Sequence, residues 1–385
     1  MSNLSFMEKL LDGVDVELKA LGDDDFIDVA NSGRKPVKAS LRVAGKIPYY
    51  GANNIQDYVD GHTHDGEYVL IAEDGSASLE NYSIQYVSEK FWANNHVHVI
   101  RGKSGLNTRF LYHYLCIVNF NPFLTGGGRA KLTKGKMVEI QIPIPCPDNP
   151  TKSLEIQAEI VRILDTFTEL TTELTTELTA RKKQYNHYRD QLLSFEEGEV
   201  EWKTLGELAE NLDSMRKPVT SGLRETGQIP YYGASGIVDY VKDYIFDGDF
   251  LLVSEDGANL LARNTPIAFS VRGKCWVNNH AHILKFNTYA ERRYVEYYLN
   301  SIDLTPYISG AAQPKLNQKN LNSIKIPNPS PEEKARIVAI LDKFDALTSS
   351  ITEGLPREIA LRQKQYEYYR DLLLSFPKPE VKGEA

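Results

Sequence analysis

The chain has 385 residues, of which 42% are hydrophobic and 25% are charged, so it holds enough material for two or three domains with cores of their own. It contains neither an apolar run of about 20 residues nor the pattern of a signal peptide, and we expect a cytoplasmic protein with no membrane partner. The net charge of −8 argues against DNA binding through bulk positive charge, but it leaves local basic surfaces open.

The sequence repeats itself, and the two copies can be followed in chain order. The segment IPYYGANNIQDYV at 47–59 returns as IPYYGASGIVDYV at 229–241, with ten of thirteen residues identical. Further on, FWANNHVHVI at 91–100 returns as CWVNNHAHIL at 275–284. Such a repeat predicts two similar domains, which can present two similar surfaces related by an approximate twofold axis.

Each copy combines strand-like and helix-like segments. The apolar runs EYVLIAED at 67–74 and DFLLVSED at 249–256 lie between turns rich in Gly, Asn and Pro, and they favour β-strands. Helical patterns follow at 109–118 and at 291–302. We therefore expect mixed α/β domains.

A longer amphipathic segment follows each copy. Within 156–192, apolar residues recur at intervals of three, four or seven, which predicts a helix of roughly 60 Å at 1.5 Å per residue. The same seam runs through 337–373, where Gly354 and Pro356 should kink the helix or divide it in two. This second segment has four additional residues, about one turn, and we expect the two seams to pack as an antiparallel coiled coil.

These patterns together predict an α+β fold, in which two similar mixed α/β domains are separated by two long antiparallel coiled-coil helices with pseudo-twofold symmetry. The expected boundaries are 1–150 for the first domain, 151–197 for the central helix, 198–330 for the second domain, 331–376 for the C-terminal helix and 377–385 for a polar tail. The repeat TELTTELTTELT at 168–179 suits either a solvated helix surface or an adjustable spacer, and the sequence leaves both open.

Motifs within the long helices carry a family resemblance. ILDTF and ILDKF lie near the beginning of the two helices, and QYNHYRDQLLSF and QYEYYRDLLLSF lie near their ends. With the order domain, helix, domain, helix, essentially the whole chain resembles the specificity subunit of a type I restriction-modification enzyme. The Thr-x-Glu-Leu units after ILDTF resemble the type IC group in particular.

The resemblance implies that each domain is a target recognition domain that reads one half of a split DNA sequence. The paired helices would act as a ruler and would dock two modification subunits. The partners would be double-stranded DNA and those two subunits, which would carry S-adenosylmethionine and methylate adenine. Restriction subunits that use ATP and Mg could join them, whereas this chain would hold no cofactor. Because its two domains share ancestry, we expect the two half-sites to be related in base sequence.

Catalytic motifs are missing from the sequence. There is no GxxxxGK[ST] phosphate loop, and Asn121-Pro122-Phe123 lacks the second proline of the methyltransferase motif NPP[YF]. We therefore expect a non-catalytic protein. Two alternatives stay open: a coiled-coil protein-interaction scaffold without sequence-specific DNA binding, and a metal-dependent enzyme that uses His-x-His pairs.

The motif Asn-Asn-His-x-His occurs in both copies, at 94–98 and at 278–282. In a strand, its two histidines would point to the same face, as two metal ligands would. No further histidine or cysteine cluster in the sequence completes such a site, so we expect no metal. The motif suits hydrogen bonding within the fold or contact with DNA, because asparagine can bind adenine N6 and N7 in the major groove.

The candidate DNA-binding residues form two groups. Polar side chains from the repeated motifs can meet base edges, and they are Tyr49, Tyr50, Asn53, Asn54, Asn94, Asn95, His96, Tyr231, Tyr232, Ser235, Asn278, Asn279 and His280. Cations beside Gly and Pro loops suit phosphate contacts, and they are Arg34, Lys35, Lys38, Arg129, Lys131, Lys134, Arg216, Lys217, Lys315 and Lys319. A role in the core for the tyrosines, and a plain solvated surface for each cation, remain the alternatives.

Overall fold

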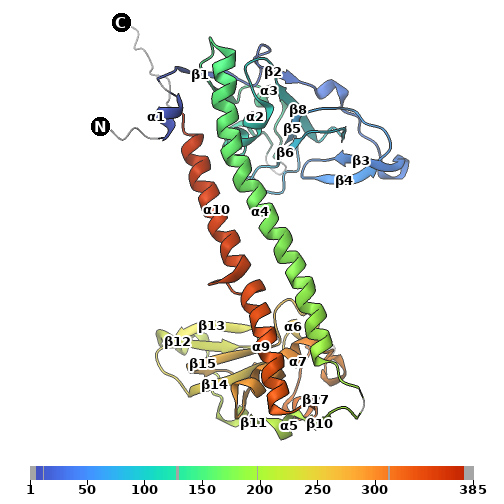
Figure 1. Cartoon of the computed structure of the whole chain (residues 1–385), viewed down its shortest axis with the longest axis vertical. Helices are drawn as coiled ribbons and strands as arrows, with labels where there is room; N and C mark the ends of the chain where they lie inside the picture. Colours follow the sequence, from blue (N-terminus) through green and yellow to red (C-terminus); the bar gives the residue numbers. More distant parts are fainter. Residues whose placement is uncertain (1–5, 12, 127–129, 197, 311–312, 377–385) are drawn as a thin grey trace. The chain divides into compact units, whose positions relative to one another are not determined.

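The computed structural model describes residues 6–11, 13–126, 130–196, 198–310 and 313–376 (Figure 1). The chain divides into two compact units. Unit 1 comprises Met1–Glu173 and Ile359–Ala385, and unit 2 comprises Leu174–Glu358. Each unit thus contains one copy of the repeat together with parts of the long helices. The narrower domain boundaries expected from the sequence stay a prediction.

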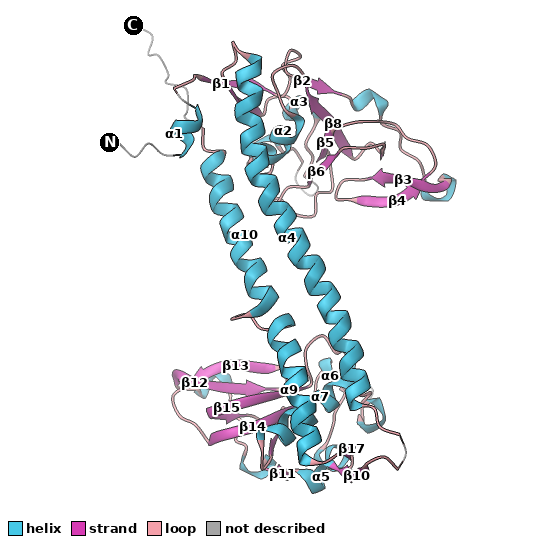
Figure 2. Cartoon of the chain, in the orientation of Figure 1, coloured by secondary structure: helices cyan, strands magenta, loops and turns pink. Residues whose placement is uncertain are grey.

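The strands of unit 1 form three sheets (Figure 2). In the first, β1 (Val16–Ala20) pairs with β9 (Gln141–Pro145). The second has the order β2-β8-β5-β6, with β2 at Ile27–Val29, β8 at Val97–Gly102, β5 at Tyr68–Ala72 and β6 at Ile84–Val87. The third has the order β4-β3-β7, with β4 at Ile55–Val59, β3 at Ala44–Tyr50 and β7 at Trp92–Ala93.

Strand β5 is buried along its whole length, because it separates two cores. Val69 and Ile71 belong to the larger core, while Tyr68 and Leu70 belong to a smaller one with Phe91. Successive side chains of a strand point to opposite faces, so a continuous apolar run fits a strand that is covered on both sides. The run EYVLIAED therefore forms a strand as expected.

Unit 2 repeats these elements in two sheets. Strand β10 (Glu201–Thr204) pairs with β17 (Lys325–Asn328). The larger sheet has the order β11-β16-β14-β15-β12-β13, with β11 at Glu210–Asn211, β16 at Ala281–Lys285, β14 at Phe246–Ser254, β15 at Ala268–Val277, β12 at Thr226–Gly233 and β13 at Gly236–Val241.

One strand explains why unit 2 has a continuous six-stranded sheet where unit 1 has two smaller ones. The beginning of β15 pairs with β14 as β6 pairs with β5, and its end pairs with Tyr231 of β12 as β7 pairs with Tyr49 of β3. In unit 1 the corresponding chain is interrupted between Val87 and Trp92. The duplication is therefore preserved in register although the sheets differ in extent.

The first long helix, α4, runs from Pro150 to Leu193, as the sequence predicts. Within unit 1, its residues Ile160 and Leu164 share a core with Leu373 of α10 (Gly354–Leu373), and Phe167 stacks on Tyr369 with 5.2 Å between ring centroids. Later residues of α4 thus meet earlier residues of α10, which is antiparallel packing. Within unit 2, Tyr188 of α4 stacks on Phe344 of α9 (Pro331–Thr348) at 5.7 Å.

The second amphipathic segment is divided as expected, but the division lies before Gly354. Residues 349–353 lie outside both α9 and α10. Gly354 has φ +73°, and a Cβ there would lie 2.3 Å from the carbonyl oxygen of Ala346, so glycine permits this close return of the chain. Pro356 lies in the first turn of α10, where its missing N–H costs little. The four additional residues of the second segment were expected to add one helical turn. They are instead accommodated by this non-helical stretch.

The aspartate of each ILD motif holds a shorter helix against a long one. In unit 1, Arg109 of α2 (Thr108–Leu115) donates from Nε to Asp165 of α4 at 2.9 Å. In unit 2, Arg293 of α7 (Tyr289–Ser301) donates from Nε to Asp342 of α9 at 3.1 Å. The remaining α-helices are short: α1 at Phe6–Leu11, α3 at Lys134–Met137, α5 at Leu205–Leu208, α6 at Asn259–Ala262 and α8 at Gln318–Asn322. Across the described residues, no helix has the length and apolar character needed to span a membrane.

Candidate nucleic-acid interface

Four segments of unit 1 that are far apart in sequence meet at one place, which we call tip 1. It consists of the turn 51–54, the loop 73–77, the turn 94–96 and Lys131. The backbone joins them: Asn94 N donates to Tyr50 O at 3.2 Å, and Glu73 N donates to His96 O at 2.8 Å. The backbone N–H of residue 132, next to Lys131, donates to the carbonyl of residue 73 at 2.8 Å. These bonds fix the relative positions of candidate side chains. The sequence identified those side chains but did not show that they lie together.

Unit 2 forms the same junction, which we call tip 2. It consists of the turn 233–236, the loop 255–258, the turn 278–280 and Lys315. Asn278 N donates to Tyr232 O at 3.0 Å, and Glu255 N donates to His280 O at 2.9 Å. Ser254 Oγ also donates to the carbonyl of Ala234. The two copies of the repeat therefore build equivalent surfaces.

Each tip presents an exposed histidine held by an acidic neighbour. His96 Nδ1 lies 2.6 Å from Asp74, and His280 Nδ1 lies 2.9 Å from Asp256. Next to them Asn95 and Asn279 are exposed at the turn, as are Asn54 of tip 1 and Ser235 of tip 2. The surface thus offers amide, imidazole and hydroxyl groups, which can bind base edges or phosphates.

Glu73 and Lys131 of tip 1 form a partly buried ion network with Arg34. Arg34 Nη1 donates to Glu73 at 2.6 Å and to the carbonyl of Val97 at 2.7 Å, and Lys131 Nζ lies 3.1 Å from Glu73. Burial by itself would raise the pKa of Glu73, but the bonds to Arg34 and Lys131 outweigh burial and lower the pKa below its ordinary value. In unit 2, Arg216 and Lys315 hold Glu255 in the same way, at 2.6 Å and 3.0 Å, and its pKa is lowered likewise.

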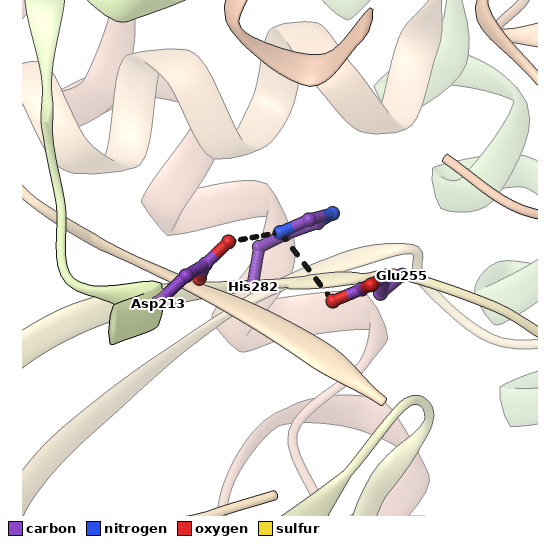
Figure 3. Close-up of side chains that lie close together, drawn as sticks. All are labelled: Asp213, Glu255 and His282. Atoms are coloured by element: carbon purple, nitrogen blue, oxygen red, sulfur yellow. Dashed lines mark hydrogen bonds and ion pairs between the residues drawn. The ribbon is translucent and has the colours of Figure 1, made fainter. Parts of the chain in front are cut away.

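The two networks differ in the partner of their central histidine. Both His98 and His282 are fully buried, and each approaches a carbonyl with Nε2, of Leu132 at 2.7 Å and of Leu316 at 2.6 Å. In unit 1, Nδ1 of His98 meets the amide nitrogen of Asn31 at 3.0 Å. In unit 2, Nδ1 of His282 meets a carboxylate oxygen of Asp213 at 2.5 Å (Figure 3).

The partner decides which hydrogen bond Nδ1 of each ring can make. An amide N–H must donate, so His98 accepts at Nδ1 and is neutral, and burial lowers its pKa. In unit 2, both nitrogens of His282 face oxygen acceptors, a carboxylate oxygen of Asp213 and the carbonyl of Leu316. Burial alone would raise the pKa of Asp213, but the hydrogen bond and charge of His282 outweigh it and lower the pKa.

Asp213, Glu255 and His282 also offer three ligand atoms within 4.8 Å of one another, as a metal site would (Figure 3). The carboxylates already have positive partners, since Arg216 lies 2.6 Å from Glu255 and 3.4 Å from Asp213, and Lys315 lies 3.0 Å from Glu255. A cation there would have to displace these side chains. We therefore assign the cluster as a buried ion network.

The His-x-His motif does not have the geometry expected of a strand. Strand β8 begins at Val97, so His96 lies in the preceding turn and His98 inside the strand. His96 is exposed, whereas His98 is buried. The expectation that the two imidazoles share one face is wrong, because Asn94 bends the chain by accepting from His96 N at 2.8 Å. The same bond joins Asn278 and His280.

Several of the predicted DNA-binding residues are engaged within the fold. Tyr49 and Tyr231 are 1% exposed, and each hydroxyl accepts from a backbone N–H, of Val37 at 3.0 Å or of Val219 at 2.9 Å. The residues with such internal roles are Arg34, Tyr49, Asn53, Asn94, Arg216, Tyr231 and Asn278. We therefore exclude these seven side chains from the proposed DNA contacts.

The other predicted residues remain available. Exposed cations lie in or beside the tips, and they are Lys35, Lys38, Lys134, Lys217, Lys315 and Lys319, of which Lys315 is also paired with Glu255. Partly exposed residues are Tyr50, Lys131 and Tyr232. Arg129 lies outside the described residues. Which of these contact DNA stays a prediction.

Sequence reasoning missed two residue types that hold the interface. Trp92 Nε1 donates to the carbonyl of Lys35 at 2.7 Å, and Trp276 Nε1 donates to that of Lys217 at 2.6 Å, so each tryptophan fixes a lysine-bearing loop. Arg42 covers the ring of Tyr49 at 4.1 Å, and Arg224 covers that of Tyr231 at 4.3 Å. Both types recur in the repeat, and that recurrence was the available signal.

Comparisons with known proteins identify the family of the chain. A family model described as "Type I restriction modification DNA specificity domain" matches residues 14–182 and 197–361. The chain is 46% identical over 402 aligned residues to a putative type I restriction enzyme specificity subunit of Haemophilus influenzae, S.HindORF215P, covering 97% of this chain and 99% of that protein. It is 37% identical to the EcoR124I/EcoR124II specificity subunit of Escherichia coli, covering 99% of each.

A solved structure is similar in fold. The crystal structure of the S subunit of a type I restriction-modification system from M. genitalium superposes with a TM-score of 0.66 at 16% identity, covering 95% of this chain and 98% of that one.

Proposed function

The chain belongs to the type I restriction-modification DNA specificity family, and from this premise we propose that tip 1 and tip 2 each read one half of a split DNA site. Within such a system the chain is the specificity subunit and not a catalytic one. The observation that carries the proposal is the repeated tip, because a bipartite site requires two readers and the chain builds the same surface twice. The two tips share their backbone geometry, which supports half-sites related in base sequence. Their exposed residues differ, which supports a difference in base sequence between the two half-sites.

The exposure of each residue indicates whether it would bind bases, bind phosphates or support the tip. Exposed Asn95, Asn279 and the neighbouring imidazoles would face base edges in the major groove. Lys35, Lys38 and Lys217 would bind phosphates and set the orientation without base preference. The ion network beneath each tip would keep the turns in place when DNA binds.

The partners belong to the same proposal. Two modification subunits would dock on this chain, bring S-adenosylmethionine and methylate adenine within the bound site. Restriction subunits would supply ATP- and Mg-dependent chemistry. We place the assembly in the cytoplasm, where chromosomal DNA is accessible.

The experiment is a selection from random DNA with the complex of this chain and its modification subunits. We expect enrichment of one split sequence with a fixed spacing, and adenine methylation within it. Enrichment of no sequence would contradict the proposal and would favour a protein-interaction scaffold. A matched variant, Asn95→Ala with Asn279→Ala, should retain assembly with the modification subunits and lose the preference.

A further inference from the structure

The hairpin at each tip contains a β-bulge at the same place. In unit 1, Ile55 lies opposite Tyr50 and Asp57 lies opposite Tyr49, so Gln56 is an extra residue without an opposite partner. In unit 2, Ile237 and Asp239 lie opposite Tyr232 and Tyr231, which leaves Val238 as the extra residue. Bulges of this kind redirect a side chain and are frequent beside functional sites.

The bulged side chain leans toward the turn that forms the tip. A Cβ added to Gly51 would lie 2.0 Å from Nε2 of Gln56, so the glutamine amide covers this glycine. A Cβ on Gly233 would lie 3.1 Å from Cγ1 of Val238. Oε1 of Gln56 also lies 3.5 Å from Nδ2 of Asn94, in the adjacent turn. Both bulged residues are nevertheless exposed.

This position is one of three at which the hairpin segments 47–59 and 229–241 differ. Asn53 is committed to the fold, because Nδ2 donates to Gly75 O at 2.7 Å and Oδ1 accepts from Ala77 N at 2.8 Å. Asn54 accepts from the N–H of its neighbour Ile55 at 2.8 Å, which occupies its carbonyl oxygen. The Nε2 group of Gln56 has no hydrogen-bond partner among the described residues, and its Oε1 makes only the 3.5 Å contact with Asn94, so Gln56 is the least committed of the three side chains.

We propose that position 56 in tip 1 and position 238 in tip 2 determine specificity at one base pair of each half-site. Glutamine is matched to the N6 and N7 edge of adenine, and an aliphatic side chain is matched to the methyl group of thymine. Gln56 therefore selects adenine in its half-site, and Val238 selects thymine at the equivalent place. This inference rests on the proposed function of the tips and names the residues that make the two halves differ.

The test exchanges the two residues in the full complex with modification subunits. Gln56→Val and Val238→Gln are each compared with the unaltered chain in selections from DNA with every half-site position randomised. We expect each variant to change its preference at one base pair of one half-site by about 10-fold, which corresponds to one base contact, and to leave the other half unchanged.

A control variant and three outcomes make the test decisive. The control is Lys46→Gln, which introduces into unit 1 the residue found at the equivalent position of unit 2, Gln228. Position 46 lies at the far end of the hairpin, so this variant should leave the preferred bases unchanged. Unaltered preferences in both exchange variants overturn the inference and leave the proposed function standing. Uniformly weaker binding with the same preferences also overturns it, because that result reveals a purely structural role. If the unaltered chain selects no sequence, the proposed function fails and the inference falls with it.

Discussion

Unit 1 and unit 2 bury the same histidine beneath the same tip but give it different partners. His98 lies between the amide of Asn31 and a carbonyl, whereas His282 lies between the carboxylate of Asp213 and a carbonyl. The surrounding arginine, glutamate and lysine are alike, so one substitution at the position of Asn31 and Asp213 places an additional carboxylate beside the buried histidine. The comparison teaches that a duplicated fold can keep its geometry while its electrostatics diverge.

The largest expected effect comes from the central arginines. Arg216→Met leaves Glu255 and Asp213 with fewer positive partners in a buried site, and we expect a loss of about 3–5 kcal/mol of unfolding free energy. Arg34→Met should cost less, because only Glu73 loses a partner and Asn31 is neutral. Urea denaturation of the two variants measures this. Equal losses of unfolding free energy in the two variants would mean that the carboxylate of Asp213 does not contribute to the difference between the units.

The two units should also differ in their response to mild acid. Burial lowers the pKa of His64, His98 and His113, all in unit 1. A lowered folded pKa means that the unfolded chain takes up these protons first, so unit 1 is fully stable above the unfolded value of about 6.5 and loses stability as the pH falls below it. We therefore expect the loss in unit 1, where these three histidines lie.

Hydrogen exchange followed by mass spectrometry, corrected for the intrinsic effect of pH, measures each unit within the intact chain. From pH 7.5 to pH 5, protection in β8 should fall more than protection in β16. Equal changes in the two strands would contradict the expectation that unit 1 is the more sensitive to acid. Glu80, which is exposed in unit 1, provides a control as Glu80→Gln, which should not alter the difference.

A smaller effect is expected from exchanging the partners of the two histidines. Asp213→Asn replaces the carboxylate at Nδ1 of His282 by an amide, and Asn31→Asp places a carboxylate at Nδ1 of His98, each with a stability change of about 1 kcal/mol because a hydrogen bond is retained. Nitrogen NMR of the imidazole rings at pH 7 measures whether either exchange changes the proton at Nδ1. Unchanged ring shifts in both variants would show that these partners do not control protonation.

The smallest expected effect concerns the cations of the flanking loops. Lys35→Ala and Lys217→Ala should weaken binding to all DNA sequences alike and reduce the slope of affinity against salt by about one, because each removes one phosphate contact. Titrations of the complex at several salt concentrations provide the measurement. A changed base preference would place these lysines at base edges instead.

Much of the fold could be predicted because its signals are local or repeated. The spacing of apolar residues in 156–192 predicted α4, and the runs at 67–74 and 249–256 predicted β5 and β14. The break near Gly354 was predicted from residue type, but its position was not, because it depends on the approach of Gly354 to Ala346. The two histidines of Asn-Asn-His-x-His do not share a strand face, because an asparagine side chain, which periodicity ignores, bends the chain just before β8.

The sequence by itself determined that this protein has two similar units, long amphipathic helices and the family motifs that they carry. Repetition and periodicity along the chain are sufficient for those conclusions. Only the tertiary structure decided which polar residues are available. Arg34 and Tyr49 form hydrogen bonds within the fold, whereas a β-bulge places Gln56 at the tip. The physical reason is that burial and hydrogen bonding depend on residues dozens of positions away, whose approach no local pattern records.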